Sequence, residues 1–90
     1  MKELKDKAAG LPSLCKDSDT VKVIRNLAEE FKYSDPVSND ATADLEMVLG
    51  NQLNDLRSAL QEGNSKEAVE LAGETLETLK ERNRISKANK

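Results

Sequence analysis

Histidine is absent from the 90 residues of this chain, and cysteine occurs only once. Without an imidazole, the chain has neither a histidine general base nor a histidine metal ligand. Cys15 lacks the histidine that would activate its thiolate, and it lacks a second cysteine for an internal disulfide. The glycine-rich patterns that cradle phosphate groups are also missing. We therefore expect no enzyme activity, no catalytic residues, no cofactor and no bound metal ion.

Aromatic side chains are nearly as scarce, because Phe31 and Tyr33 are the only two. Leu, Ile, Val and Phe together supply 20 of the 90 residues. This share lies just above the roughly 20 % below which a highly charged chain is usually disordered. The net charge is only −3, which also favours folding. We therefore expect a core of leucine, valine and alanine, which suits closely packed helices.

Long apolar segments are missing as well. No stretch approaches the roughly 18–20 apolar residues that a membrane-spanning helix needs. The N-terminal residues are mostly charged, and no apolar run typical of a secretory signal follows them. A lone cysteine fits a reducing compartment. These features predict a cytoplasmic protein that does not associate with membranes.

The clearest positive signal is a helical hairpin in the second half of the chain. Leucines recur at helical spacing in two stretches, which predicts helices at about residues 39–61 and 65–82. Gly63 suits the left-handed position just past a helix end. Asn64 suits the N-cap of the next helix, with Glu67 completing a capping box. A connection this short places the two helices antiparallel and side by side.

Two further helices are predicted in the first half of the chain. An apolar stripe predicts a helix from about 19 to 33, with Ser18 or Asp19 as its N-cap. A weaker pattern predicts a short helix over residues 2–11, which Pro12 ends.

The start of the helix at about 39 has more than one solution. Either Asp35 caps it with Pro36 in the first helical position, or Ser38 or Asn39 caps it later.

These elements predict an all-α fold, a small three-helix bundle with a short extra N-terminal helix. The antiparallel hairpin at about 39–61 and 65–82 forms its larger part. We expect a single helical domain over residues 1–90. Residues 1–17 are predicted to attach loosely, and residues 83–90 are predicted to form a frayed basic tail.

The segment from Gly63 to Glu77 resembles the turn and second helix of a tetratricopeptide-type repeat. In that family a Gly-Asp/Asn turn leads to an alanine needed for close contact between helices, and Ala68 holds that position here. Thr75 stands where the family prefers alanine, the proline that ends the repeat is missing, and the chain holds no second copy. The resemblance implies a tight turn between two closely packed helices, with Ala68 at their contact.

Acidic side chains form a ridge on the last predicted helix. They are spaced by three or four residues and therefore share one side of it: Glu67, Glu70, Glu74, Glu77 and Glu81. On the preceding helix, Asp44 and Asp55 also share a face. If the two rows converge, they form a negative patch that attracts a basic partner. The alternative is an ordinary solvated face, because glutamate is a good helix former. The seven residues are our hypothetical partner-binding site.

Two other features have alternative interpretations. The C-terminal segment is basic through Arg82, Arg84, Lys87 and Lys90, and it has no interleaved aromatic residue for base stacking. Such a tail either binds nucleic acid weakly, in a salt-dependent manner, or is a frayed solubilising end. Gln52 lies inside an apolar stripe, where it either bonds to a backbone group or marks a contact with a second chain.

The sequence therefore predicts a non-catalytic helical module for protein–protein interaction or regulation. The expected partner is another protein with a basic surface, or a second copy of this chain in a homodimer. The alternative function is that of a nucleic-acid-associated accessory protein that uses the basic C-terminal tail. The acidic body of the chain makes nucleic acid the less favoured partner.

Overall fold

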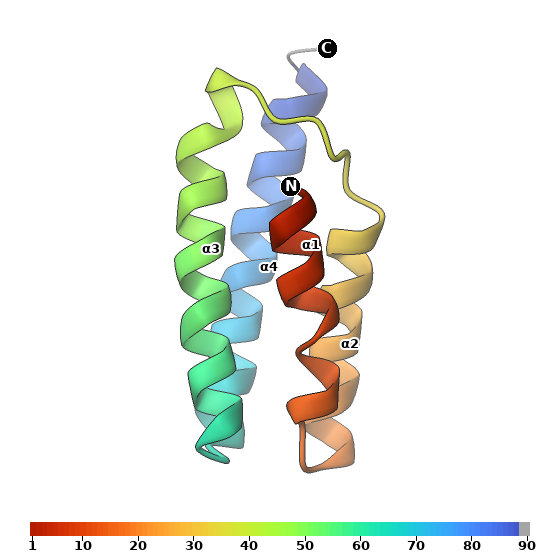
Figure 1. Cartoon of the computed structure of the whole chain (residues 1–90), viewed down its shortest axis with the longest axis vertical. Helices are drawn as coiled ribbons and strands as arrows, with labels where there is room; N and C mark the ends of the chain where they lie inside the picture. The colour runs from red at the N-terminus through yellow and green to blue at the C-terminus, as the bar shows by residue number, and fades with distance from the viewer. Residues whose placement is uncertain (89–90) are drawn as a thin grey trace.

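The computed structural model describes residues 1–88, which form a bundle of α-helices (Figure 1). The helices are α1 (Lys2–Ala9), α2 (Ser18–Lys32), α3 (Asp40–Gln61) and α4 (Ser65–Ala88). One short 3-10 turn, η1 (Pro12–Leu14), follows α1. No strand occurs in this part of the chain. The predicted all-α bundle, with its short N-terminal helix and its C-terminal hairpin, is confirmed.

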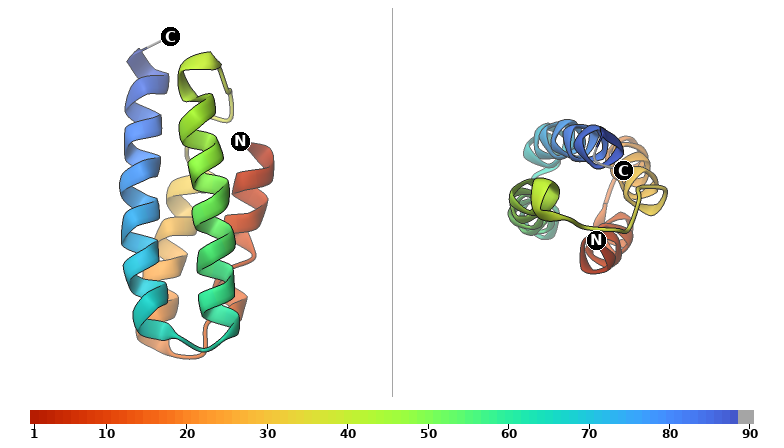
Figure 2. Two further views of the ribbon diagram at one scale, coloured as in Figure 1. Left: turned by 90° about the vertical axis from the view of Figure 1, so that its left-hand side faces the viewer. Right: turned by 90° about the horizontal axis from the view of Figure 1, so that it is seen from above.

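The four helices stand at the corners of a square, and each runs in the direction opposite to the helix before it in the chain (Figure 2). Around the bundle the order is α1, α2, α4 and α3, and each neighbouring pair is in contact. The consecutive helices α2 and α3 therefore stand on a diagonal. Residues 33–39 connect them by crossing one end of the bundle above the start of α1, and we call this segment the crossover.

The apolar stripes of all four helices meet in one core. Its buried members are Ala8, Leu11, Ile24, Leu27, Phe31, Leu49, Leu53, Leu56, Ala59, Leu60, Ala68, Ala72 and Leu79. At the crossover end, two polar residues, Thr42 and Arg82, are fully buried. The predicted stripe of α3 is correspondingly less buried there, with Leu45 half-buried and Val48 43 % exposed.

The N-terminal segment packs against the bundle, which corrects the prediction that residues 1–17 attach loosely. Ala8 is fully buried and Leu11 is 2 % exposed, so both belong to the core. Lys5 adds a polar anchor, since its Nζ donates to the carbonyl oxygens of Lys32, at 3.2 Å, and of Ser34. The short helix completes a core that the three longer helices leave open on one side.

The turn between α3 and α4 follows the predicted chemistry. Gly63 has a φ of 77°, the left-handed conformation that glycine adopts without steric cost. The side-chain oxygen of Asn64 accepts the backbone N–H of Glu67 at 3.2 Å, as an N-cap does. The carboxylate of Glu67 binds the side-chain amide of Asn64 at 2.9 Å rather than its backbone N–H. Ala68 is fully buried, as the helix contact requires.

Side chains also cap the N-termini of α2 and α3. Asp17, and not Ser18 or Asp19, caps α2 by accepting the backbone N–H of Thr20 at 2.7 Å. Its second oxygen accepts the hydroxyl of Ser65 at 2.7 Å, which ties the start of α2 to the start of α4. Among the alternatives for α3, Asn39 is the cap, and it forms a reciprocal capping box with Thr42.

Helix α4 continues to Ala88, which corrects the prediction of a frayed tail from residue 83. The reason is that polar side chains replace apolar ones as the contacts of its last turns. Arg82 is fully buried and Ser86 is 3 % exposed. Asn83 donates to the hydroxyl of Ser34 at 2.9 Å. Lys90 and its neighbour at 89 lie outside the described residues.

Arg82 holds the crossover against the two long helices. Its Nε donates to Glu46 on α3 at 3.1 Å. Its two terminal nitrogens donate to the backbone carbonyls of Asp35 and Val37, each at 2.8 Å, and one of them also donates to Asn83 at 3.1 Å. Burying a guanidinium is costly unless a counter-charge and acceptors surround it, and this site supplies both.

We expect Arg82→Ala to lower the free energy of unfolding by about 3–5 kcal/mol, because it removes the positive partner of Glu46 and the donors to two backbone carbonyls. Arg84→Ala is the matched control. Arg84 is exposed, and within residues 1–88 its only ion pair is with Glu81, so its loss should leave stability nearly unchanged. Urea unfolding monitored by circular dichroism measures both. Equal midpoints for the two variants would contradict the structural role of Arg82.

Candidate functional site

All seven acidic residues of the predicted partner-binding site are exposed. We call them the acidic face: Glu67, Glu70, Glu74, Glu77 and Glu81 on α4, with Asp44 and Asp55 on α3. On α4 the buried positions include Ala68, Ala72 and Leu79, which lie on the other side of the helix from the glutamates. The glutamates thus form one outward row along α4.

The row of glutamates lies toward α3 rather than toward α2. Arg82 reaches α3 through Glu46, whereas Asn83 reaches Ser34 at the end of α2. Successive residues are about 100° apart around a helix. Glu81 therefore lies on the opposite side of Arg82 from Asn83, which places the glutamate row beside the junction of α3 and α4.

The two aspartates of α3 lie beside the same junction. Asn54 faces α1, because Lys7 donates to its side-chain oxygen at 3.5 Å. Asp55 is one residue further and therefore lies on the flank away from α1, toward α4. Asp44 precedes it by about three helical turns and falls on the same flank. Helices α3 and α4 run side by side (Figure 2), and the helical positions of the acidic residues place both rows along this junction.

Local partners neutralise only part of the acidic face. Arg84 donates to Glu81 at 3.1 Å, and this hydrogen bond holds the pKa of Glu81 below its usual value. Within residues 1–88, the other members of the face make no ion pair. In the same part of the chain, no group of three carboxylates or thiols is close enough to hold a metal ion. The arrangement is an extended negative surface rather than a chelating site.

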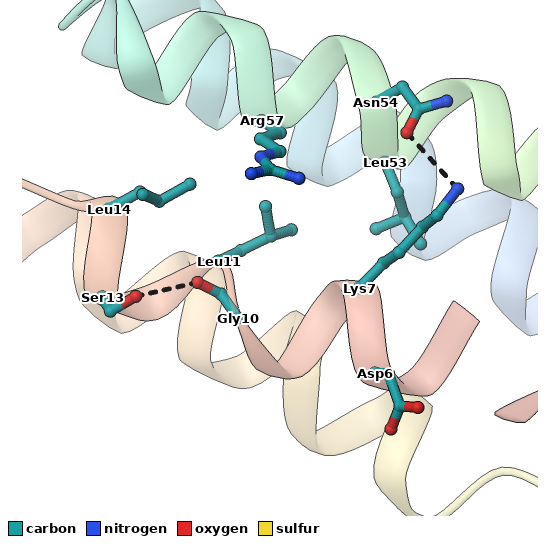
Figure 3. A pocket seen from close by; sticks show the side chains of 9 residues that line it. All are labelled: Asp6, Lys7, Gly10, Leu11, Ser13, Leu14, Leu53, Asn54 and Arg57. Atoms are coloured by element: carbon teal, nitrogen blue, oxygen red, sulfur yellow. Dashed lines mark hydrogen bonds between the residues drawn. The ribbon is translucent and has the colours of Figure 1, made fainter. Parts of the chain in front are cut away.

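A groove between α1, η1 and α3 is a second candidate surface, and its volume is about 310 Å³ (Figure 3). Leu11 and Leu53 form its floor, and the half-buried Leu14 closes one end. Lys7 and Arg57 flank the leucines with their cationic ends. The sequence did not reveal this site, because its two sides are far apart in the chain and neither carries a recognisable motif.

The remaining residues considered from sequence have simpler positions. Cys15 is half-buried, and burial together with the charge of Asp17 raises the pKa of its thiol, which disfavours the reactive thiolate. Gln52 is half-buried, and its Oε1 accepts no hydrogen bond within residues 1–88. In the predicted basic tail, Arg82 is buried and Arg84 is paired, so Lys87 is the remaining exposed cation among the described residues.

Comparison of the chain with protein-family models, with curated proteins and with solved structures finds no match. Within residues 1–88, no helix is both long enough and apolar enough to cross a membrane. The two surfaces must therefore be interpreted from their own chemistry.

Glu46, on α3, accepts hydrogen bonds from Ser38 of the crossover and from Arg82 of α4. Burial raises the pKa of its carboxyl, but hydrogen bonds from Ser38, Thr42 and Arg82 and the positive charge of Arg82 outweigh that effect. The net pKa is lower than the usual value. A carboxyl whose pKa is lower in the folded state stabilises the protein above its unfolded pKa, and this contribution is lost as the pH falls through the folded pKa.

We expect Glu46→Gln to lower the free energy of unfolding at pH 7 by about 1–3 kcal/mol, because a charged hydrogen-bond acceptor is removed. The difference from the wild type should shrink as the pH falls through the lowered pKa of Glu46, because the carboxyl of the wild type then becomes protonated as well. Glu74→Gln, on the exposed row, is the control, because it removes one carboxylate that makes no ion pair within residues 1–88. Urea midpoints measured at pH 7, 5 and 3 give the answer. A deficit that is the same at every pH would exclude the ion pair as its cause.

Proposed function

We propose that this protein is a non-catalytic helical module that binds another protein through the acidic face. The observation that carries the proposal is a row of exposed carboxylates along the junction of α3 and α4. Glu70, Glu74 and Glu77, together with both aspartates, have no ion-pair partner within residues 1–88. Their charge is available to a partner.

The charge arrangement is unfavourable for the isolated helix. Like charges four residues apart, such as Glu70 and Glu74, destabilise a helix by about 0.2–0.5 kcal/mol per pair. A partner that carries lysine or arginine relieves this repulsion. A surface of one sign also speeds the encounter with an oppositely charged protein, and the effect weakens as salt increases.

The chemistry of the face also selects the kind of partner. Two copies of this chain that met through their acidic faces would bring like charges together, which is costly at an interface. A homodimer through this face is therefore disfavoured. The supported partner is a different protein with a basic surface, and a row along a helix suits a complementary row of lysine or arginine on another helix.

The test uses a short helical peptide with lysine and arginine on one face. We expect the triple variant Glu70→Gln, Glu74→Gln and Glu77→Gln to weaken its binding about tenfold at low salt. The matched control replaces three exposed carboxylates of α2, as Asp19→Asn, Glu29→Gln and Glu30→Gln, and changes the net charge equally. Isothermal titration calorimetry measures the affinities. Equal losses in the two variants, or no binding to the wild type, would contradict the proposal.

The same two triple variants can be used to find the natural partner by affinity capture. Proteins retained by the wild type and by the α2 variant, but lost by the α4 variant, are the candidates, and mass spectrometry identifies them in an extract of the source cells. We expect those proteins to be released by moderate salt, because exposed charge pairs are screened.

A further inference from the structure

The groove between α1, η1 and α3, which we call the α1–α3 groove, carries charge of the opposite sign to the acidic face. Arg57 is exposed and makes no ion pair within residues 1–88. Among the described residues, the Nζ of Lys7 donates only to the uncharged side-chain oxygen of Asn54, at 3.5 Å. Asp6 is the one acidic residue of the lining, and its carboxylate points away from Arg57 (Figure 3). Two cations therefore face the opening without a counter-charge.

The floor between those cations is apolar. Leu11 is 2 % exposed and Leu53 is 1 % exposed, so both are held firmly by the core. Leu14, which is half-buried, lies at the η1 end and leaves part of its surface open to a ligand. A volume of about 310 Å³ is at the lower end of the range for ligand pockets. It suits one or two side chains rather than a large cofactor.

From this geometry we infer that the α1–α3 groove docks an acidic peptide segment of a partner protein. An apolar side chain of that segment fills the space above Leu11, Leu14 and Leu53. Aspartate or glutamate beside it meets Lys7 and Arg57, and the guanidinium presents a planar fork of donors to a carboxylate. Charge complementarity selects this occupant, because a basic segment would be repelled by both cations. The inference uses a different surface from the acidic face and does not depend on it.

The groove needs an occupant that both covers its leucines and supplies acceptors to its cations. Other classes of occupant meet only one of these two requirements. A nucleic-acid phosphate would satisfy the cations but would leave the leucine floor uncovered. An uncharged apolar segment would cover the floor but would leave Lys7 and Arg57 without acceptors. A second copy of this chain would have to use its own acidic face, so that the contact would join two different surfaces of the chain and would depend on protein concentration.

The experiment uses a short helical peptide with one leucine flanked by glutamates on the same face. Titration into the isotope-labelled protein, followed by amide chemical shifts, should give saturable changes at residues 6–14 and 53–57. A peptide with lysine in place of the glutamates should not bind. A peptide with alanine in place of the leucine should bind more weakly. Equal binding of the lysine peptide, or no saturable change, would overturn the inference.

Protein variants separate the groove from general charge effects. Arg57→Glu should weaken the acidic peptide about fivefold, and Arg57→Gln should weaken it less. Lys22→Glu on α2 removes an exposed cation outside the groove, and it should leave the affinity unchanged. Because Arg57 and Lys22 are both exposed, the variants should fold, and circular dichroism verifies this. Equal losses for Arg57→Glu and Lys22→Glu would overturn the inference. A final measurement varies the protein concentration in the absence of peptide. Chemical-shift changes at both the groove and α4 would then identify a second copy of the chain as the occupant, and this result would also overturn the inference.

Discussion

The buried guanidinium of Arg82 is the constraint on which the architecture depends. The chain must connect two diagonal helices, α2 and α3, and the crossover that does so has few apolar side chains of its own to bury. Arg82 instead binds two of its backbone carbonyls and the carboxylate of Glu46 at once. The three acceptors satisfy a charge that would otherwise destabilise the interior. One side chain thereby sets the path of the crossover and the length of α4.

Polar contacts fix both ends of the bundle. Arg82 closes the crossover end, and the hydrogen bond between Asp17 and Ser65 ties α2 to α4 at the other. With α3 and α4 held side by side, their carboxylates line one junction. With α1 packed on the other flank of α3, Lys7 and Arg57 meet across a leucine floor. The protein thus presents an acidic face and a cationic groove on two sides of the same helix.

Local chemistry made the helices predictable, and distant pairing made the rest unpredictable. Leucine spacing and the cap residues around Gly63 act within a few residues, so the hairpin and its turn followed from the sequence. The cap of α2 was predicted at Ser18 or Asp19, one or two residues too late, because Asp17, Ser18 and Asp19 are all good caps. The acidic row of α4 could be found because it belongs to one helix. The groove and the burial of Arg82 could not, since Glu46 lies 36 residues away in the chain.

Native-state hydrogen exchange tests the role of Arg82 most directly, because it reports the stability of each turn of α4 separately. If the guanidinium anchors the end of this helix, the backbone amides of residues 82–86 exchange nearly as slowly as those of residues 72–79 in the middle of the core. Exchange at the rate of an unstructured peptide in residues 82–86, while residues 72–79 stay protected, would contradict the account.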